Sequence, residues 1–83
     1  MILTYELNTD LCNRAAAQLN WNLTTLRSAI NIQGARMING KSLVGILSAN
    51  FKKGDIIKII FDYDNEAQKV KDFFNDVGSE FNE

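Results

Sequence analysis

The 83-residue sequence contains no histidine and no proline, and cysteine occurs only once, at Cys12. Without histidine, the chain cannot use a Cys–His pair, a histidine-ligated zinc ion or a phosphohistidine. One cysteine cannot form an internal disulfide, so nothing in the sequence indicates an oxidising compartment. The N-terminal residues lack the pattern of a signal peptide, and no stretch reaches the length of a membrane span. We therefore expect a cytoplasmic protein that does not enter a membrane.

Positive and negative charges nearly balance, because 9 basic and 10 acidic side chains give a formal net charge of −1. Nucleic-acid binding requires a clustered basic face, so we expect no nucleic-acid partner. The sequence shows neither an acid–base pair typical of catalysis nor a metal-binding cluster, and we expect no enzymatic activity, no cofactor and no metal. The length predicts a single domain over residues 1–83.

The hydrophobic pattern predicts elements in the order β-α-β-β-α-β-α. Alternating apolar and polar residues predict four strands, at residues 2–7, 27–33, 36–39 and 55–63. In the last strand, the side chains expected on one face are Ile57, Ile59 and Phe61.

Apolar residues three and four positions apart predict three helices. The first helix starts near Asp10 or Cys12, the second is capped by Ser42 and the third is capped by Asp64. The third helix is expected to extend as far as Phe81, because its apolar residues keep helical spacing: Ala67, Val70, Phe74, Val77 and Phe81.

Cys12 falls where the first strand gives way to the first helix. A thiol at this point lies beside the positive end of the helix dipole, which favours the thiolate form. From the residues alone, Cys12 is a reactive group, a small buried residue or a substitute for another residue. Trp21 lies off the apolar stripe of the same helix, and it is either exposed or folded over the helix end.

In this element order, the chain resembles the HPr family, the small phosphocarriers of the bacterial phosphoenolpyruvate-dependent sugar phosphotransferase system. The stretch NGKSLVGILS at residues 39–48 is similar to the family's serine signature, N-x-KSIMGVMS. The turn KKGD at residues 52–55 stands where the family has a glycine-bearing turn. The resemblance covers nearly the whole chain and implies an α+β fold. The implied architecture is an open-faced β-sandwich, a four-stranded antiparallel sheet with three helices on one face.

The family's other signature differs in this chain. Family members carry Gly-Leu-His-Ala-Arg-Pro-Ala, with the phosphorylated histidine at the start of the first helix, whereas residues 10–16 read DLCNRAA. By resemblance, Cys12 stands at the phosphoacceptor position and Arg14 at that of the arginine that neutralises the phosphoryl group. Asp10 replaces the family's glycine, and we expect its carboxylate to repel an incoming phosphate.

The resemblance leaves three functions open, each for a monomeric protein. In the favoured one, HPr kinase/phosphorylase modifies Ser42, which would otherwise serve only as a helix cap, and the chain acts in carbon regulation. The following residues, Leu43, Val44 and Leu47, match an apolar patch that docks partners such as a transcriptional regulator. Alternatively, Cys12 accepts a phosphoryl group from enzyme I as phosphocysteine. The third function is that of an adaptor or redox-sensing domain that carries no phosphate.

Overall fold

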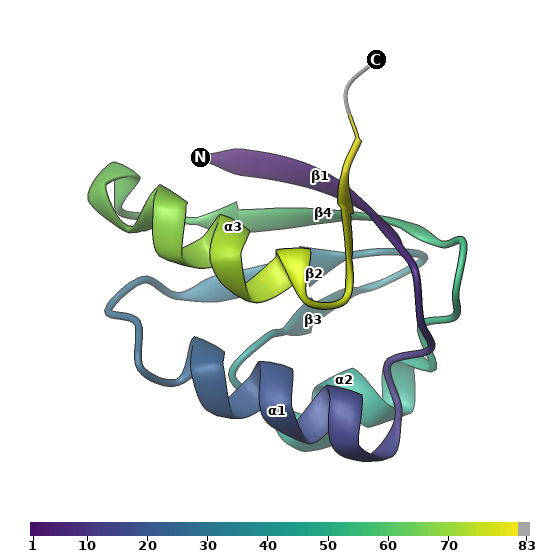
Figure 1. Ribbon diagram of the computed structural model, residues 1–83. Helices are drawn as coiled ribbons and strands as arrows, with labels where there is room; N and C mark the ends of the chain where they lie inside the picture. Colours follow the sequence, from purple (N-terminus) through teal and green to yellow (C-terminus); the bar gives the residue numbers. More distant parts are fainter. Residues whose placement is uncertain (82–83) are drawn as a thin grey trace.

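The computed structural model describes residues 1–81, which form a sheet covered by helices (Figure 1). The elements, in chain order, are β1 (Ile2–Leu7), α1 (Asn13–Leu23), β2 (Ile30–Gln33), β3 (Met37–Asn39), α2 (Leu43–Ala49), β4 (Ile56–Phe61), the 3₁₀ helix η1 (Asp64–Glu66), α3 (Ala67–Asn75) and β5 (Gly78–Glu80). The predicted α+β fold is confirmed. Within the described residues, no helix is both long and apolar enough to cross a membrane.

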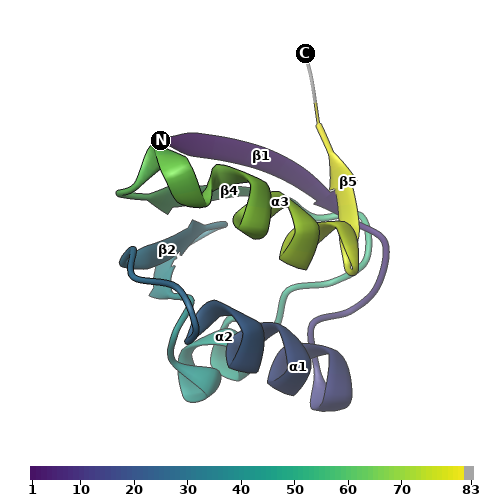
Figure 2. The ribbon, with the colours of Figure 1, turned by 60° about the vertical axis from the view of Figure 1, so that its left-hand side comes forward.

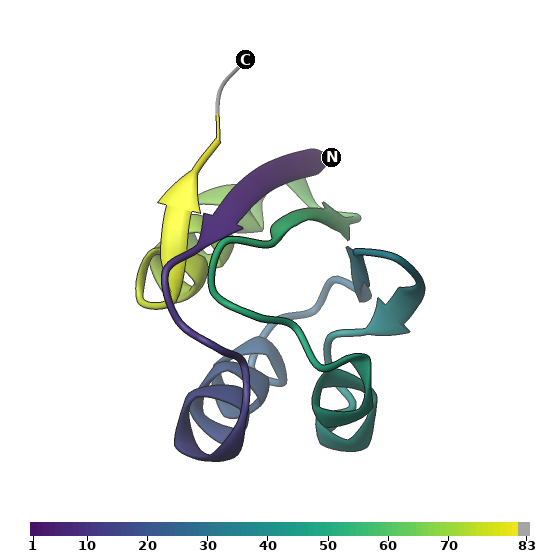
Figure 3. The ribbon, with the colours of Figure 1, turned by 90° about the vertical axis from the view of Figure 1, so that its right-hand side faces the viewer.

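The strands form one sheet in the order β3-β2-β4-β1-β5, and every neighbouring pair is antiparallel. The register places Tyr5 of β1 opposite Ile57 of β4, and Ile32 of β2 opposite Ile59 of β4. The helices pack on one face of this sheet, with α3 above α1 (Figure 2). Seen from the side, α1 and α2 lie next to each other at the bottom of the molecule (Figure 3).

The core lies between the sheet and the helices, and alternating strand residues supply eight of its 18 buried hydrophobic side chains. In β1 and β4 the residues that point inward are buried: Leu3, Tyr5, Leu7, Ile57, Ile59 and Phe61. The hydroxyl of Tyr5 donates a hydrogen bond to Asn75 Oδ1 at 2.8 Å, which ties β1 to the end of α3. Burial raises the pKa of Tyr5, and the carboxylates of Glu80 and Asp72 add to this effect. The phenol therefore stays protonated and keeps its donor role.

The C-terminal part of the chain differs from the prediction. Helix α3 ends at Asn75, and Gly78–Glu80 forms a fifth strand, β5, so the sheet has five strands rather than four. Gly78 allows this pairing, because a Cβ atom at this position would collide with the backbone carbonyl oxygen of Glu6. The N–H of Phe81 continues the pairing by donating to the carbonyl of Thr4 at 2.7 Å. Strand pairing therefore overrides the helical spacing of the apolar residues.

The predicted cap of the third helix is also wrong. Asp64 begins the 3₁₀ helix η1, and the residue that precedes α3 is Glu66, which makes no side-chain cap hydrogen bond within its own helix. The carboxylate of Glu66 instead reaches across to the loop that follows α1.

This loop replaces the predicted first part of β2, which begins at Ile30 rather than residue 27. The carboxylate of Glu66 accepts the N–H of Arg27 at 2.9 Å and the N–H of Ser28 at 2.8 Å. Asp62 Oδ2 accepts the next N–H, from Ala29, at 3.0 Å. These N–H groups therefore bond to side chains rather than to a neighbouring strand. The hydrogen bond from Arg27, with that from Ser28, lowers the pKa of Glu66 despite partial desolvation.

We predict that Glu66→Gln lowers the free energy of unfolding at neutral pH. The pKa of Glu66 is lower in the folded chain than in the unfolded chain. The ionised carboxylate therefore contributes fully to the free energy of unfolding above the usual glutamate pKa, and this contribution is lost as the pH falls through the folded-state pKa. The difference in free energy of unfolding between the variant and the unmodified sequence should shrink in acid. Urea unfolding over a pH series measures this difference. The control is Glu6→Gln, because Glu6 is exposed on β1. Equal deficits in both variants, or a Glu66→Gln deficit unchanged in acid, would contradict this role.

Candidate functional site

Cys12 occupies the N-cap position of α1, with extended backbone angles of φ −139° and ψ 164°. Its thiol is free and exposed, and it makes no capping hydrogen bond. The carbonyl of Cys12 accepts the first hydrogen bond of the helix, from Ala16, at 3.4 Å. The interpretation of Cys12 as a small buried residue is therefore wrong, and the thiol is available to a reactant.

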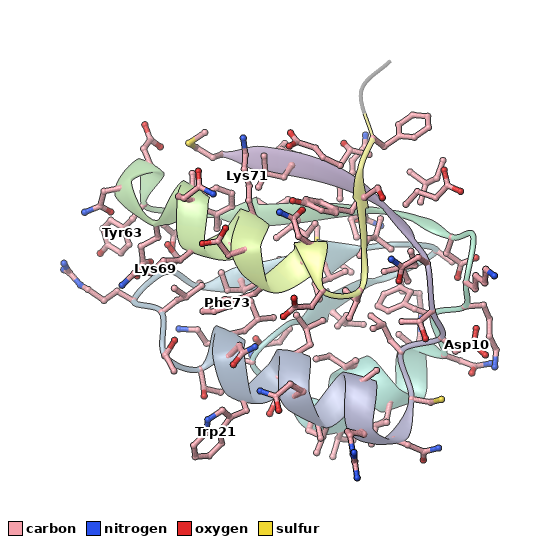
Figure 4. The ribbon with its side chains drawn as sticks, viewed as in Figure 1. Asp10, Trp21, Tyr63, Lys69, Lys71 and Phe73 are labelled. Atoms are coloured by element: carbon pink, nitrogen blue, oxygen red, sulfur yellow. The ribbon has the colours of Figure 1, made fainter. Side chains whose placement is uncertain are left out.

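The loop before α1 is held by the loop between α2 and β4. The N–H of Leu11 donates to the carbonyl of Phe51 at 3.0 Å, and the side chain of Leu11 is buried in the core. The N–H of Lys53 donates to Asp10 Oδ1 at 2.8 Å, and Figure 4 shows Asp10 beside this loop. Asp10, which the sequence predicts to repel phosphate, thus also has a structural role, because it brings Lys53 to the start of α1.

A shallow depression of about 490 Å³ surrounds the thiol. It is lined by Asn8, Thr9, Asp10, Cys12, Asn13, Arg14, Ala15 and Lys53. Neither cation of this group is in an ion pair within residues 1–81, where the single pair is Lys71 with Glu80. Arg14 and Lys53 both line the depression around the thiol. Arg14 was expected from the resemblance to the family signature, whereas Lys53 was missed because it comes from a distant loop.

Asn13, the first residue of α1, adopts a left-handed backbone conformation with φ 49°. Few residues other than glycine take this conformation, although asparagine tolerates it better than most. The strain lies directly beside Cys12, and strained backbone of this kind is often found at functional sites. It sets the direction in which α1 leaves Cys12.

We predict that Asn13→Ala lowers the free energy of unfolding by about 1 kcal/mol, whereas Asn13→Gly leaves it unchanged or raises it, because glycine adopts positive φ without strain. Ala17→Gly is the control, since glycine inside an exposed stretch of the same helix should lower stability by about 1 kcal/mol. Urea unfolding measures all three variants. A loss in Asn13→Gly as large as that in Asn13→Ala would contradict the assigned strain.

Ser42 lies at the N-cap of α2, as predicted. Its Oγ accepts the N–H of Gly45 at 3.1 Å, and its own N–H donates to the carbonyl of Asn39 at 3.0 Å. Ser42 as a residue is partly exposed. The serine therefore caps the helix and remains within reach of another molecule.

The helix that follows Ser42 divides into a buried and an exposed apolar side. Ile46 is fully buried, whereas the three residues predicted to dock partners are exposed: Leu43 by 37%, Val44 by 75% and Leu47 by 43%. Trp21 of α1 is 71% exposed and projects from the helix rather than folding over its end (Figure 4). Apolar side chains thus face outward on both neighbouring helices.

No metal centre is formed by the described part of the chain, because residues 1–81 contain no group of three or more histidine, cysteine, aspartate or glutamate side chains placed to hold an ion. The polar groups at the two candidate positions are the Cys12 thiol and the Ser42 hydroxyl, and the side chains of Arg14 and Lys53 line the depression around the thiol.

An antiparallel sheet with three helices on one face defines an open-faced α+β sandwich. The family model described as the PTS HPr component phosphorylation site matches residues 3–75. The chain belongs to the HPr family. No curated protein sequence matches it.

Solved HPr structures share this fold over nearly their whole length. HPr-C-His from Thermoanaerobacter tengcongensis has 25% sequence identity and a TM-score of 0.82, covering 93% of this chain and 90% of that chain. The histidine-containing phosphocarrier protein from Mycoplasma has 23% identity and a TM-score of 0.81, covering 92% and 93%. Phosphocarrier protein HPr from Bacillus anthracis has 22% identity and a TM-score of 0.77, covering 93% of each chain.

Proposed function

We propose that this HPr family member is a regulatory protein that is switched by phosphorylation of Ser42, rather than a histidine phosphocarrier. The observation that carries the proposal is the position of Ser42, a partly exposed cap directly before three exposed apolar residues, in a chain without histidine. In this role the chain is a cytoplasmic monomer and the substrate of HPr kinase/phosphorylase, not an enzyme itself. A transcriptional regulator is the partner that the family resemblance implies.

Phosphorylation at Ser42 fits the electrostatics of α2. The first turn of this helix has no acidic residue, and its free N–H groups favour a negative charge at the cap. A phosphoryl oxygen can take the N–H of Gly45 that Ser42 Oγ accepts in the unmodified chain. The modified helix therefore keeps its cap and gains a charge beside the residues proposed to dock partners, Leu43, Val44 and Leu47.

We predict that purified HPr kinase with ATP adds one phosphoryl group, seen by intact mass, and that Ser42→Asn abolishes the gain. Asparagine is chosen because it caps helices as well as serine does but accepts no phosphate. Ser48→Ala is the matched control. Ser48 lies in the same helix, where its Oγ donates to the carbonyl of Gly45 at 3.2 Å, and the variant should be modified normally.

A histidine-containing HPr should be modified in parallel by the same kinase preparation. If that protein is modified and this chain is not, regulation through Ser42 is wrong. Modification that persists in Ser42→Asn would place the phosphoryl group on another residue and would equally reject the proposal.

The exposed thiol supports a second candidate function, a carrier that uses Cys12 as phosphocysteine. Arg14 and Lys53 line the same depression as the thiol, so two cations are available to a phosphoryl group there. The carboxylate of Asp10 opposes this binding, although one of its oxygens accepts the N–H of Lys53.

Incubation with phosphoenolpyruvate and enzyme I separates the two functions. The regulatory proposal predicts no mass gain in the unmodified sequence and a gain in Cys12→His, because that substitution restores the acceptor in a site that still has its arginine. A gain in the unmodified sequence that Cys12→Ala removes would instead establish a cysteine carrier. Intact mass spectrometry under neutral conditions measures each case.

A further inference from the structure

A second cavity lies between α1 and α3, next to the depression at the Cys12 thiol, with which it shares three lining residues. It has a volume of about 300 Å³, at the lower end of the range for small-molecule sites. From α1 it is lined by Ala15 and Leu19, and from α3 and the residues after it by Phe73 and Val77. Figure 4 shows Phe73 on the side of α3 that faces α1. The floor of this cleft is therefore apolar.

Two charged residues line the same cleft, and they have opposite signs. Arg14 lies in the first turn of α1, and Asp76 is the C-cap residue that directly follows α3. Both are exposed, and neither is in an ion pair within residues 1–81. The polar residues on the α1 side are less available, because Gln18 Nε2 donates to Asn22 Oδ1 at 3.2 Å. The cleft thus offers one free cation and one free anion.

Each of these charges has the sign that its helix end disfavours. A cation in the first turn of a helix faces the positive end of the dipole, and an anion at the C-cap faces the negative end. The first turn of α1 has no acidic residue and the last turn of α3 has no basic residue to offset them. A ligand carboxylate near Arg14 and a ligand ammonium near Asp76 would each neutralise the side chain and the adjoining helix end together.

We propose that the α1–α3 cleft binds a small zwitterion, an α-amino acid with an apolar side chain. In this arrangement the carboxylate meets Arg14, the ammonium meets Asp76 and the apolar side chain packs against Leu19 and Phe73. The three features of the cleft match the three parts of such a ligand. The inference goes beyond phosphorylation and does not depend on the acceptor role of Ser42 or Cys12.

Amide chemical shifts of the unphosphorylated full chain, followed during titration with L-leucine, test this inference without any kinase or enzyme I. We expect saturable shifts at Ala15, Leu19, Phe73 and Val77, with an affinity in the millimolar range for so small a ligand. Each part of the ligand is then removed in turn. 4-Methylpentanoate lacks the ammonium, 3-methylbutylamine lacks the carboxylate and glycine lacks the side chain, and each should bind at least about tenfold more weakly.

The matched variants are Asp76→Asn, which removes the proposed ammonium partner, and Asp72→Asn. The second side chain belongs to α3 but accepts a hydrogen bond from Gln68 at 2.9 Å and does not line the cleft. Asp76→Asn should weaken L-leucine binding about tenfold and leave the affinity for 4-methylpentanoate unchanged or higher, whereas Asp72→Asn should alter neither.

Three results would overturn the inference. They are the absence of saturable shifts with L-leucine, equal binding of L-leucine and 4-methylpentanoate, and L-leucine binding that is unaffected by Asp76→Asn. Because the readout is binding to the unmodified chain, none of these results bears on whether Ser42 or Cys12 is phosphorylated.

Discussion

Backbone hydrogen bonds between the segment that leads into α1 and the segment that follows α2 determine where both helices lie. The N–H of Leu7 donates to the carbonyl of Asp55 at 2.9 Å, and the N–H of Gly54 donates to the carbonyl of Leu7 at 2.8 Å. The bond from Leu11 to Phe51 extends this contact to the residue before Cys12. Since α1 starts immediately after this contact and α2 ends shortly before it, the position of the thiol depends on residues distant in sequence.

The sequence predicts those parts of the fold whose residues alternate or repeat against one core. The inward residues of β4 and the apolar stripe of α1 are buried as expected, because a simple period decides which side faces the sheet. The same reasoning fails for Val77 and Phe81, which keep helical spacing beyond the end of α3. Their conformation is set by the free edge of β1, and Gly78 lets the chain approach that edge closely. Local periodicity contains no information about an edge formed elsewhere in the chain.

In the candidate site, too, some residues could be predicted from the local sequence and others could not. Cys12 and Arg14 lie two positions apart in the stretch that resembles the family signature, so the resemblance alone predicts that they belong to one site. Lys53 reaches the site through the carboxylate of Asp10, and this contact is visible only in three dimensions. The left-handed backbone of Asn13 is equally hidden, because asparagine is common in many conformations and its φ here follows from the fixed positions of the loop and the helix. The cleft between α1 and α3 has residues from both ends of the chain, and no local pattern predicts it.

The lack of histidine affects how a partner protein would recognise a phosphate at Ser42. An isolated charge on an exposed surface contributes little binding energy, because water and salt screen it. Beside Ser42, however, Val44 and Leu47 expose apolar surface that a partner can bury at the same time. Recognition of the modified chain then needs a cationic group next to an apolar surface, a combination that few partners offer by chance. With no phosphohistidine on the chain, the charge at this position would depend on the state of Ser42 rather than on two competing modifications. A partner that senses this charge would then respond to the state of Ser42, as the proposed regulatory role requires.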